Sequence, residues 1–392
     1  MAGFQPLLFS EINKDAAATY RANRAAGVVE VGDIYQFTNA QIAQLKTQWI
    51  ADGMTGVDVV AGGPPCQGYS KIGHRRTFDL EKQDIPSNQL FHQMIRVVKA
   101  FRPRIFLFEN VGGLLTAKWT DKGKNGEIFR DVLRGFLAIK EYSVRWQLVH
   151  SKDYGVPQNR PRVLIVGIRN DQNITIPPSK PSKHTIIEPS AIEDGLLPSP
   201  DHDYPNLVEL LGDLRDPNFV NGGSTANYLT PPLNQVQTRL RTRLNGVTLG
   251  QGAEITDHEY SHHKPRIVEK FAYMIANDSE IPEHMRTKKF AQKVLPKKWG
   301  KTGPNITATS MPDDYVHYSQ PRILSVREWA RLQTFPDWYV FRGPRTTGGR
   351  RRAGDPSAGL WARDVPKYTQ IGNAVPVELA RKVGLHLSAL LG

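Results

Sequence analysis

The stretch Val57-Asp-Val-Val-Ala-Gly-Gly-Pro-Pro-Cys66 joins a strand-like segment to a thiol, and the fold can be predicted outward from it. Residues 57–61 are mostly apolar and β-branched, which is typical of a short buried strand. Gly62 and Gly63 end the strand, and two prolines then fix the backbone directly before Cys66. Ligands of parallel α/β sheets bind beyond the carboxyl ends of the strands, so this position suits a nucleophilic thiol.

Cys66 is the only cysteine among the 392 residues. A small cysteine buried at a strand end explains the same pattern, because free cysteine is among the most buried residue types. A single cysteine excludes an internal disulfide and a zinc site of the CxxC kind, and we expect no metal. A free thiol is typical of a reducing compartment, and no apolar run is long enough to span a membrane. We therefore expect a cytoplasmic, nucleoid-associated protein with no membrane partner.

The charge of the chain points to a polyanionic partner. Lysine and arginine number 51 and aspartate and glutamate 38, which gives a net charge of +13. Such an excess favours binding to nucleic acid. A soluble protein that is merely basic is the alternative on charge alone.

Strand-like and helix-like segments alternate along most of the chain. Because the strands are apolar on both faces, we predict an α/β fold with a parallel sheet and helices on both sides. Glu11, Asp33, Cys66 and Glu109 each follow a strand-like run, so the same architecture predicts that they face one crevice. The expected strands are residues 28–31, 57–61, 104–108, 142–150 and 162–168, and the expected helices are 13–23, 42–49, 89–101, 128–139, 326–333 and 377–391.

The regular pattern is interrupted between residues 171 and 315, where prolines cluster and lysines follow. We predict a smaller, irregular region there, laid over a main domain formed by residues 1–170 and 316–392. Order returns at Ser325, a plausible helix N-cap with Glu328 three residues later, which is the pattern of a capping box.

Two further groups can act beside the thiol. Glu109 ends an apolar strand and is a candidate acid or hydrogen-bonding group. Arg160 and Arg162 occupy alternate positions at the start of a strand, so both point to one side. A solvated strand end explains Glu109 equally well, and a surface pair or structural salt bridge explains the arginines.

Five blocks, in this order, together resemble the DNA (cytosine-5)-methyltransferases of bacteria and phages. They are Pro65-Cys-Gln67, Glu109-Asn-Val111, Gln158-Asn-Arg-Pro-Arg162, the segment 322–337 and Gln370-Ile-Gly-Asn-Ala-Val-Pro376. Residues 255–258 also look like a segment of some bacterial members. The resemblance implies a Rossmann-like, S-adenosylmethionine-dependent methyltransferase domain in residues 1–170. It also implies a target-recognition region in 171–315 and a return to the catalytic domain, with a C-terminal helix, in 316–392.

The resemblance also implies roles for the site residues. Cys66 would add to carbon 6 of a cytosine, Glu109 would bind the ring N3 and the exocyclic amine, and Arg162 would contact the carbonyl oxygen. Arg160 would support the active-site loop. The partner would be double-stranded DNA with the target base flipped out, and Gln67 and Ser70 would fill the gap or hold a phosphate. The motifs do not identify the base that removes the carbon-5 proton.

The methyl donor implied is S-adenosylmethionine. Glu11 with Ile12 would accept the ribose hydroxyls, and Asp33 with Ile34 would bind the adenine. Other positions of the donor pocket would be Pro65, Leu90, Asn373 and Val375. Ordinary core packing is the alternative for Leu90 and Val375.

The chain departs from the family pattern at its start. The usual first strand and glycine-rich Phe-x-Gly-x-Gly-Gly turn, which holds the methionine end of the donor, is not found. A late or truncated start, a second polypeptide that supplies the piece, or loss of activity would each explain this. We expect a methyltransferase of restriction–modification or of phage or host DNA protection. The alternatives are one subunit of a split enzyme and a DNA-binding protein without turnover.

Overall fold

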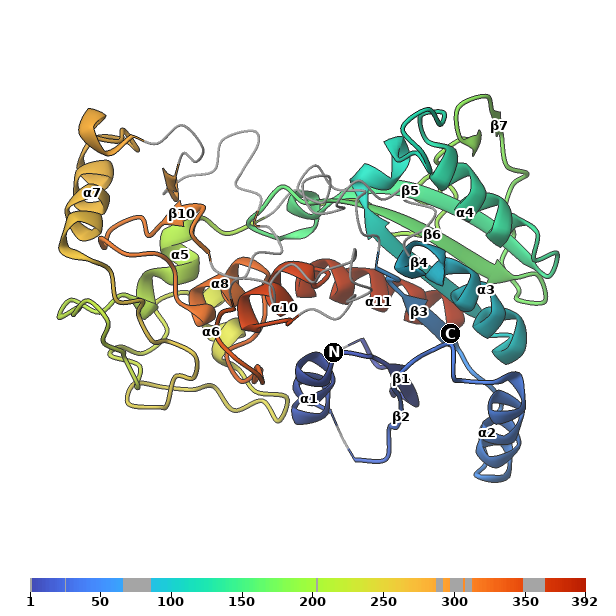
Figure 1. Ribbon diagram of the computed structural model, residues 1–392. Coiled ribbons are helices and arrows are strands. Elements are labelled where there is room, and N and C mark those ends of the chain that lie inside the picture. The colour runs from blue at the N-terminus through green and yellow to red at the C-terminus, as the bar shows by residue number, and fades with distance from the viewer. Residues whose placement is uncertain are drawn as a thin grey trace.

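The fold is described from a computed structural model, which covers residues 2–24, 26–65, 86–201, 204–286, 292–296, 306, 312–347 and 364–392. A four-stranded sheet forms one side of the molecule, and a helical, loop-rich region forms the other (Figure 1). The order of the strands across the sheet is β3 (Val59–Gly62), β4 (Ile105–Val111), β6 (Pro161–Arg169) and β5 (Tyr142–His150).

The sheet is mixed, so the prediction of a parallel sheet is wrong for one strand. β3 is parallel to β4, but β6 is antiparallel to both β4 and β5. The ten residues 151–160 that join β5 to β6 contain only a single 3₁₀ turn. A connection without a crossover helix returns the chain as an antiparallel neighbour.

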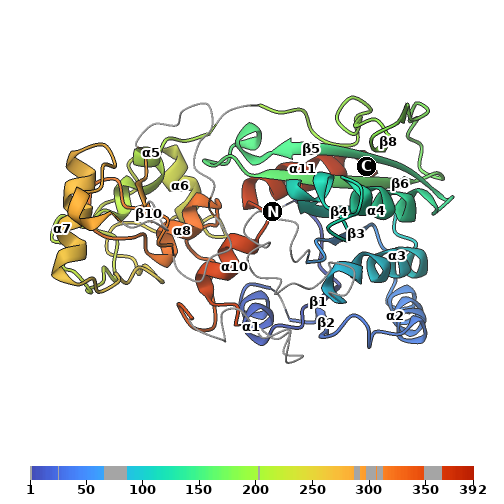
Figure 2. The same cartoon turned by 45° about the horizontal axis from the view of Figure 1, so that its top comes forward.

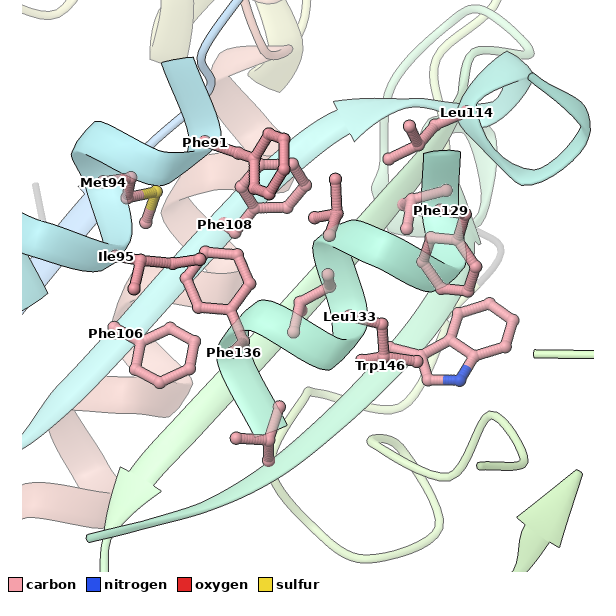
Figure 3. Packing of buried hydrophobic residues seen from close by; sticks show 14 of the residues in the cluster. Phe91, Met94, Ile95, Phe106, Phe108, Leu114, Phe129, Leu133, Phe136 and Trp146 are labelled. Atoms are coloured by element: carbon pink, nitrogen blue, oxygen red, sulfur yellow. The ribbon is translucent and has the colours of Figure 1, made fainter. Parts of the chain in front are cut away.

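Helices cover both faces of this sheet, as predicted. On one face α3 (Leu90–Phe101) and α4 (Glu127–Leu137) bury an aromatic cluster against β4 and β5, in which Phe106 stacks on Phe136 with ring centroids 4.9 Å apart (Figure 3). On the other face α11 (Val377–Leu391) packs Leu379, Val383 and Leu387 against the strands (Figure 2). The amphipathic spacing of α3 and α4 places their apolar side chains toward the sheet.

A separate two-stranded parallel sheet holds the N-terminal segment. It consists of β1 (Leu8–Ser10) and β2 (Val29–Val31), joined by α1 (Lys14–Ala22) and followed by α2 (Asn39–Ala51). Leu8, Val31 and Val60 share one apolar cluster, so this small sheet lies beside β3. Among the described residues no strand pairs with the outer edge of β3 or with the second edge of β1. The four strands β1 to β4 therefore form two parallel pairs instead of one sheet.

The remaining elements are short and are joined by long connections. They are β7 (Pro181–Ser182), β8 (Ile186–Ile187), α5 (Leu207–Leu211), α6 (Gln235–Arg241), α7 (Pro265–Ala276), β9 (Lys293–Val294), β10 (Tyr315–Val316), α8 (Val326–Leu332) and α10 (Lys367–Asn373). In the part of the chain that the structure describes, no helix is long and apolar enough to cross a membrane.

The changes in packing do not coincide with the changes in composition at residues 171 and 315. Ile187 packs on the α4 face of the sheet, and Leu196 and Leu197 pack on the α11 face, so residues up to about 197 belong to the sheet's core. A second core begins at Leu207 and also includes α8 and α10. The proline-rich composition shows where regular helices and strands stop. The boundary between the two hydrophobic cores depends instead on which apolar side chains pack together. The roles assigned to the three segments stay predictions.

The capping box of α8 is confirmed. The Ser325 hydroxyl accepts the Glu328 backbone N–H at 3.2 Å, and the Glu328 carboxylate accepts the Ser325 N–H at 2.8 Å. Arg331 of the same helix lies fully buried between Asp213 and Asp337, with both ion pairs at 2.5 Å. These buried charges join α8 to the segment that directly follows α5.

Replacing Arg331 by methionine should lower the free energy of unfolding by about 3–5 kcal/mol, because two buried carboxylates lose their shared guanidinium. The measurement is the urea unfolding midpoint. Arg134→Met is the matched control, since Arg134 pairs with Asp131 on the exposed surface of α4, and we expect about 1 kcal/mol or less there. Equal decreases in the free energy of unfolding in the two variants would show that the buried ion pairs of Arg331 stabilise the fold no more than an exposed pair does.

Candidate active site

The centre of the site is an ion pair between neighbouring strands. Glu109 lies near the end of β4 and Arg162 near the start of β6, and the two strands pair there in antiparallel register. Arg162 Nε lies 2.6 Å from Glu109 Oε1. The side chain of Arg162 is 4% exposed and that of Glu109 17%, which leaves part of the carboxylate open. The structure therefore brings these two predicted residues together.

The segment that leads to Cys66 lies against this pair. A Cβ atom at Gly63 would stand 2.7 Å from Glu109 Oε2, so any other residue here would force the carboxylate to shift. The side-chain amide of Asn110 donates to the Pro64 carbonyl at 3.2 Å. Both contacts hold the chain at the end of β4, two to three residues before Cys66. Cys66, Gln67 and Ser70 themselves lie outside the described residues.

Burial raises the pKa of Glu109, and the positive charges of Arg162 and Arg160 reduce that increase. A raised pKa keeps a larger fraction of the carboxyl protonated at any given pH. The protonated form can donate a hydrogen bond to a ring nitrogen, which a carboxylate cannot do.

Arg160 is buried, and its guanidinium donates to backbone carbonyls. One of its Nη atoms donates to the Ile306 carbonyl at 2.7 Å, and the other donates to the Gly372 carbonyl. Burial, followed by the charge of Arg162, lowers the pKa of Arg160 to about 9. Arg160 thus fastens the start of β6 to the end of α10, which fits a supporting role.

Glutamine side chains join three of the sequence blocks. Gln158 Nε2 donates to the Leu332 carbonyl at 3.0 Å and to Gln333 Oε1 at 2.7 Å. Gln333 Nε2 in turn donates to the Ile371 carbonyl at 2.8 Å. All of these groups are buried, so the contacts fix β6, α8 and α10 to one another.

The residues expected to bind the donor lie on the small sheet. Glu11 follows β1 and Asp33 follows β2, and because these strands are parallel both acids lie at the same end. Glu11 accepts the Asn13 N–H at 2.7 Å, and Asp33 accepts the Tyr35 N–H at 2.9 Å. Burial raises the pKa of Glu11. The Ile12 side chain beside it is 75% exposed, unusually so for an isoleucine.

The remaining donor candidates are dispersed. The Ile34 carbonyl accepts from Arg96 of α3 at 3.0 Å, and Leu90 is the half-buried first residue of that helix. Pro65 is exposed, and so is Asn373 at the end of α10. Val375 packs against the cluster under the sheet, as its core-packing alternative predicts. Among the described residues no hydrogen bond or ion pair joins Glu11 or Asp33 to Glu109 or Arg162.

The two acids fit a nucleoside-containing donor. Two carboxyl groups at one end of a parallel pair of strands can accept hydrogen bonds from ribose hydroxyls. The exposed apolar side chain beside them can pack against a base. No group of three or more His, Cys, Asp or Glu side chains within the described ranges is arranged to hold a metal ion.

Comparison with known proteins assigns the family. The sequence profile of the C-5 cytosine-specific DNA methylases matches residues 1–389. The chain belongs to this family. The methylase is 31% identical to type II methyltransferase M.DdeI of Desulfomicrobium norvegicum, over 99% of this chain and 84% of that protein. It is 30% identical to type II methyltransferase M.XorII of Xanthomonas oryzae pv. oryzae, over 98% and 79%.

A solved structure supports the fold of the methylase. A crystal structure described as a DNA modification methyltransferase encoded within an E. coli prophage superposes with a TM-score of 0.66 at 22% identity, over 100% of this chain and 94% of that one. The likeness confirms the predicted α/β methyltransferase fold.

Sequence reasoning missed three residues that build the site: Gly63, Asn110 and Gln333. Each lies inside or beside a block that the sequence made conspicuous. A signal existed for Gly63, because a glycine directly after a strand often marks a close approach of another group. Asn110 and Gln333 bond to groups far away in the sequence, several of which are backbone carbonyls. No local sequence pattern predicts such contacts.

Proposed function

We propose that this DNA (cytosine-5)-methyltransferase acts on a flipped-out cytosine in a specific duplex sequence through a covalent adduct of Cys66. The observation that carries the proposal is the buried Glu109–Arg162 pair packed against Gly63, three residues before the thiol. Its setting would be restriction–modification or protection of phage or host DNA in the cytoplasm.

The reacting base supplies the logic of the site. Carbon 5 of cytosine is a weak nucleophile, and addition of the Cys66 thiolate to carbon 6 makes it enamine-like. A protonated Glu109 would donate to N3 and accept from the exocyclic amine, and Arg162 would donate to the carbonyl oxygen. Both interactions stabilise the electron density that the ring gains, which is often the largest catalytic term. Carbon 5 then takes the methyl group from the sulfonium, whose sulfur–methyl bond breaks and leaves a neutral thioether. Loss of the carbon-5 proton to a base finally lets the carbon–sulfur bond to Cys66 break and releases the thiolate.

S-adenosylmethionine, the methyl donor of the family, supplies an electrophilic methyl group on a sulfonium. We assign its ribose to Glu11 with Ile12 and its adenine to Asp33 with Ile34, supported by the exposure of Ile12 and the shared end of β1 and β2. Pro65, Leu90 and Asn373 are assigned to the remaining positions of the pocket. Gln67, Ser70 and residues 171–315 are assigned to DNA.

Among the described residues, one edge of β1 and the outer edge of β3 pair with no other strand. Both edges carry backbone groups that a further strand would satisfy, and both strands border the same apolar cluster. We propose that a strand ending in a glycine-rich turn pairs between them, either from residues that precede this sequence or from a second polypeptide. A DNA-binding protein without turnover is the competing function, favoured if the two edges stay unfilled.

Incubation of the 392-residue chain with labelled donor and cytosine-containing duplex tests these proposals. We expect little or no transfer by the chain alone and transfer when a segment with the strand and glycine turn is added. Full activity of the chain alone would contradict the need for a further strand. DNA binding with no transfer in either case would favour the DNA-binding protein.

A further inference from the structure

The short helix α10 contacts four separate parts of the methylase. It lies between α1 and α8 in both views (Figures 1 and 2). We propose that α10 is the positioning element that sets the target-recognition side and the donor side of the enzyme relative to Arg160, with Lys367 and Gln370 as positioning residues. The roles of the two sides rest on the proposed function.

The first residue of α10 contacts the segment around Asp257. Lys367 Nζ lies 2.6 Å from Asp257 Oδ1. A lysine in the first turn of a helix is electrostatically unfavourable, because the N-terminal end of the helix dipole is already positive. The Asp257 carboxylate offsets that cost. The presence of a lysine at this position is therefore explained by its ion pair with Asp257 and not by stabilisation of the helix.

Asp257 is itself held in an unusual conformation. Its φ is +64°, its residue is 8% exposed, and its carboxylate lies 3.7 Å from Arg327 of α8. A non-glycine residue in the left-handed region persists only where the surrounding structure over-determines it. The Arg327 N–H donates to the Asp257 carbonyl at 2.9 Å, which fixes the backbone as well. Residues 255–258, the segment that resembles some bacterial members of the family, thus hold the Asp257 carboxylate in a fixed position for its ion pair with Lys367.

The middle of α10 faces the donor side. The Thr19 hydroxyl of α1 donates to Gln370 Oε1 at 2.7 Å, and Gln370 Nε2 donates to the Arg342 carbonyl at 2.9 Å. α1 joins β1 to β2, the strands that end in Glu11 and Asp33. Since this small sheet is not paired with β3 among the described residues, its position depends on side-chain contacts, to which this hydrogen bond adds beside the apolar cluster.

The last turn of α10 faces the catalytic strands. The Gly372 carbonyl accepts from Arg160, and the Ile371 carbonyl accepts from Gln333. Gly372 lies five positions after Lys367, which is about 8 Å along a helix. One rigid element of that length therefore connects Asp257, Thr19 and Arg160.

The test compares Lys367→Met, Asp257→Asn and Thr19→Val in the full chain. Duplex affinity is read by anisotropy of a labelled random-sequence pool, and the freedom of α1 by hydrogen exchange. We expect Lys367→Met and Asp257→Asn each to weaken DNA binding at least about 5-fold, with exchange in α1 unchanged. Thr19→Val should speed exchange in α1 at least about 5-fold, with DNA affinity unchanged. Lys367→Arg should restore wild-type affinity, because it keeps the pair with Asp257.

The two charge changes separate positioning from simple attraction to phosphate. If Lys367 acts only as a surface charge, Lys367→Met weakens binding and Asp257→Asn strengthens it, which would overturn the proposal. Parallel changes of both readouts in every variant would also overturn it, as general unfolding. Lys382→Met is the control, since it removes the same charge as Lys367→Met but from a partly exposed pair of α11 with Asp201, and it should leave both readouts unchanged. Neither readout requires turnover, so loss of methyl transfer alone would count against the proposed function and not against α10.

Discussion

Replacing Cys66 by serine should reduce methyl transfer by about 10⁴-fold or more, the scale on which removal of a nucleophile acts. A hydroxyl is a far weaker nucleophile toward carbon 6 than a thiolate at neutral pH. Asn110 and Gly63 hold the chain against β4 up to Pro64 and do not change in the variant. The measurement is single-turnover transfer of labelled methyl groups to duplex DNA, with the segment that completes the donor site present.

The alternative for Cys66, a small buried side chain at a strand end, predicts a different result. A hydroxyl that replaces a buried thiol without a partner costs about 1–3 kcal/mol of stability, while each folded molecule keeps its turnover. Unfolding midpoints and DNA affinity of the Cys66→Ser variant distinguish the two. A lower midpoint with undiminished transfer per folded molecule would remove Cys66 from the chemistry.

Replacing Glu109 by glutamine should lower kcat by about 10²–10³-fold, as removal of one preorganised hydrogen-bonding group does. Glutamine has nearly the same shape and still fits against Gly63, but it cannot supply the acidic proton to N3. Arg162 would also lose the charge that faces its Nε. The measurement is kcat at saturating DNA and donor, with the segment that completes the donor site present.

The pH dependence of the same variant supplies the control. Burial raises the pKa of Glu109, so the active, protonated form extends to higher pH, and kcat should fall as pH rises through that pKa. The stability contribution has the same sign: it is present below the ordinary glutamate pKa and is lost as pH rises through the raised one. In Glu109→Gln this limb of the kcat profile should disappear. Its persistence would show that another group titrates.

Local pattern predicted most of the regular elements of the sheet. The predicted strand at residues 142–150 and the helix at 377–391 have the observed bounds of β5 and α11. The capping box at Ser325 was equally visible, because it depends on residues three apart. The direction of β6 was not, since apolar composition is the same for parallel and antiparallel central strands.

Which parts of the chain share a core could not be predicted. α8 and α10 pack with residues from Leu207 onward, through buried pairs such as Arg331 with Asp213. Those partners lie more than a hundred residues apart, and a charged side chain in a sequence is ordinarily expected at the surface. The catalytic pair differs, because Glu109 and Arg162 each mark the end of a strand in a recognisable block.

The most direct test of the proposed mechanism is covalent trapping on duplex DNA that contains 5-fluorocytosine, with S-adenosylmethionine present and the donor site completed as described. Fluorine at carbon 5 blocks the elimination that releases the enzyme. Intact mass spectrometry should show one protein joined to one duplex, with the bond mapped to Cys66, and none with Cys66→Ser. An adduct that persists in Cys66→Ser, or a wild-type protein that transfers methyl groups to ordinary duplex and forms no adduct, would contradict the covalent role of Cys66.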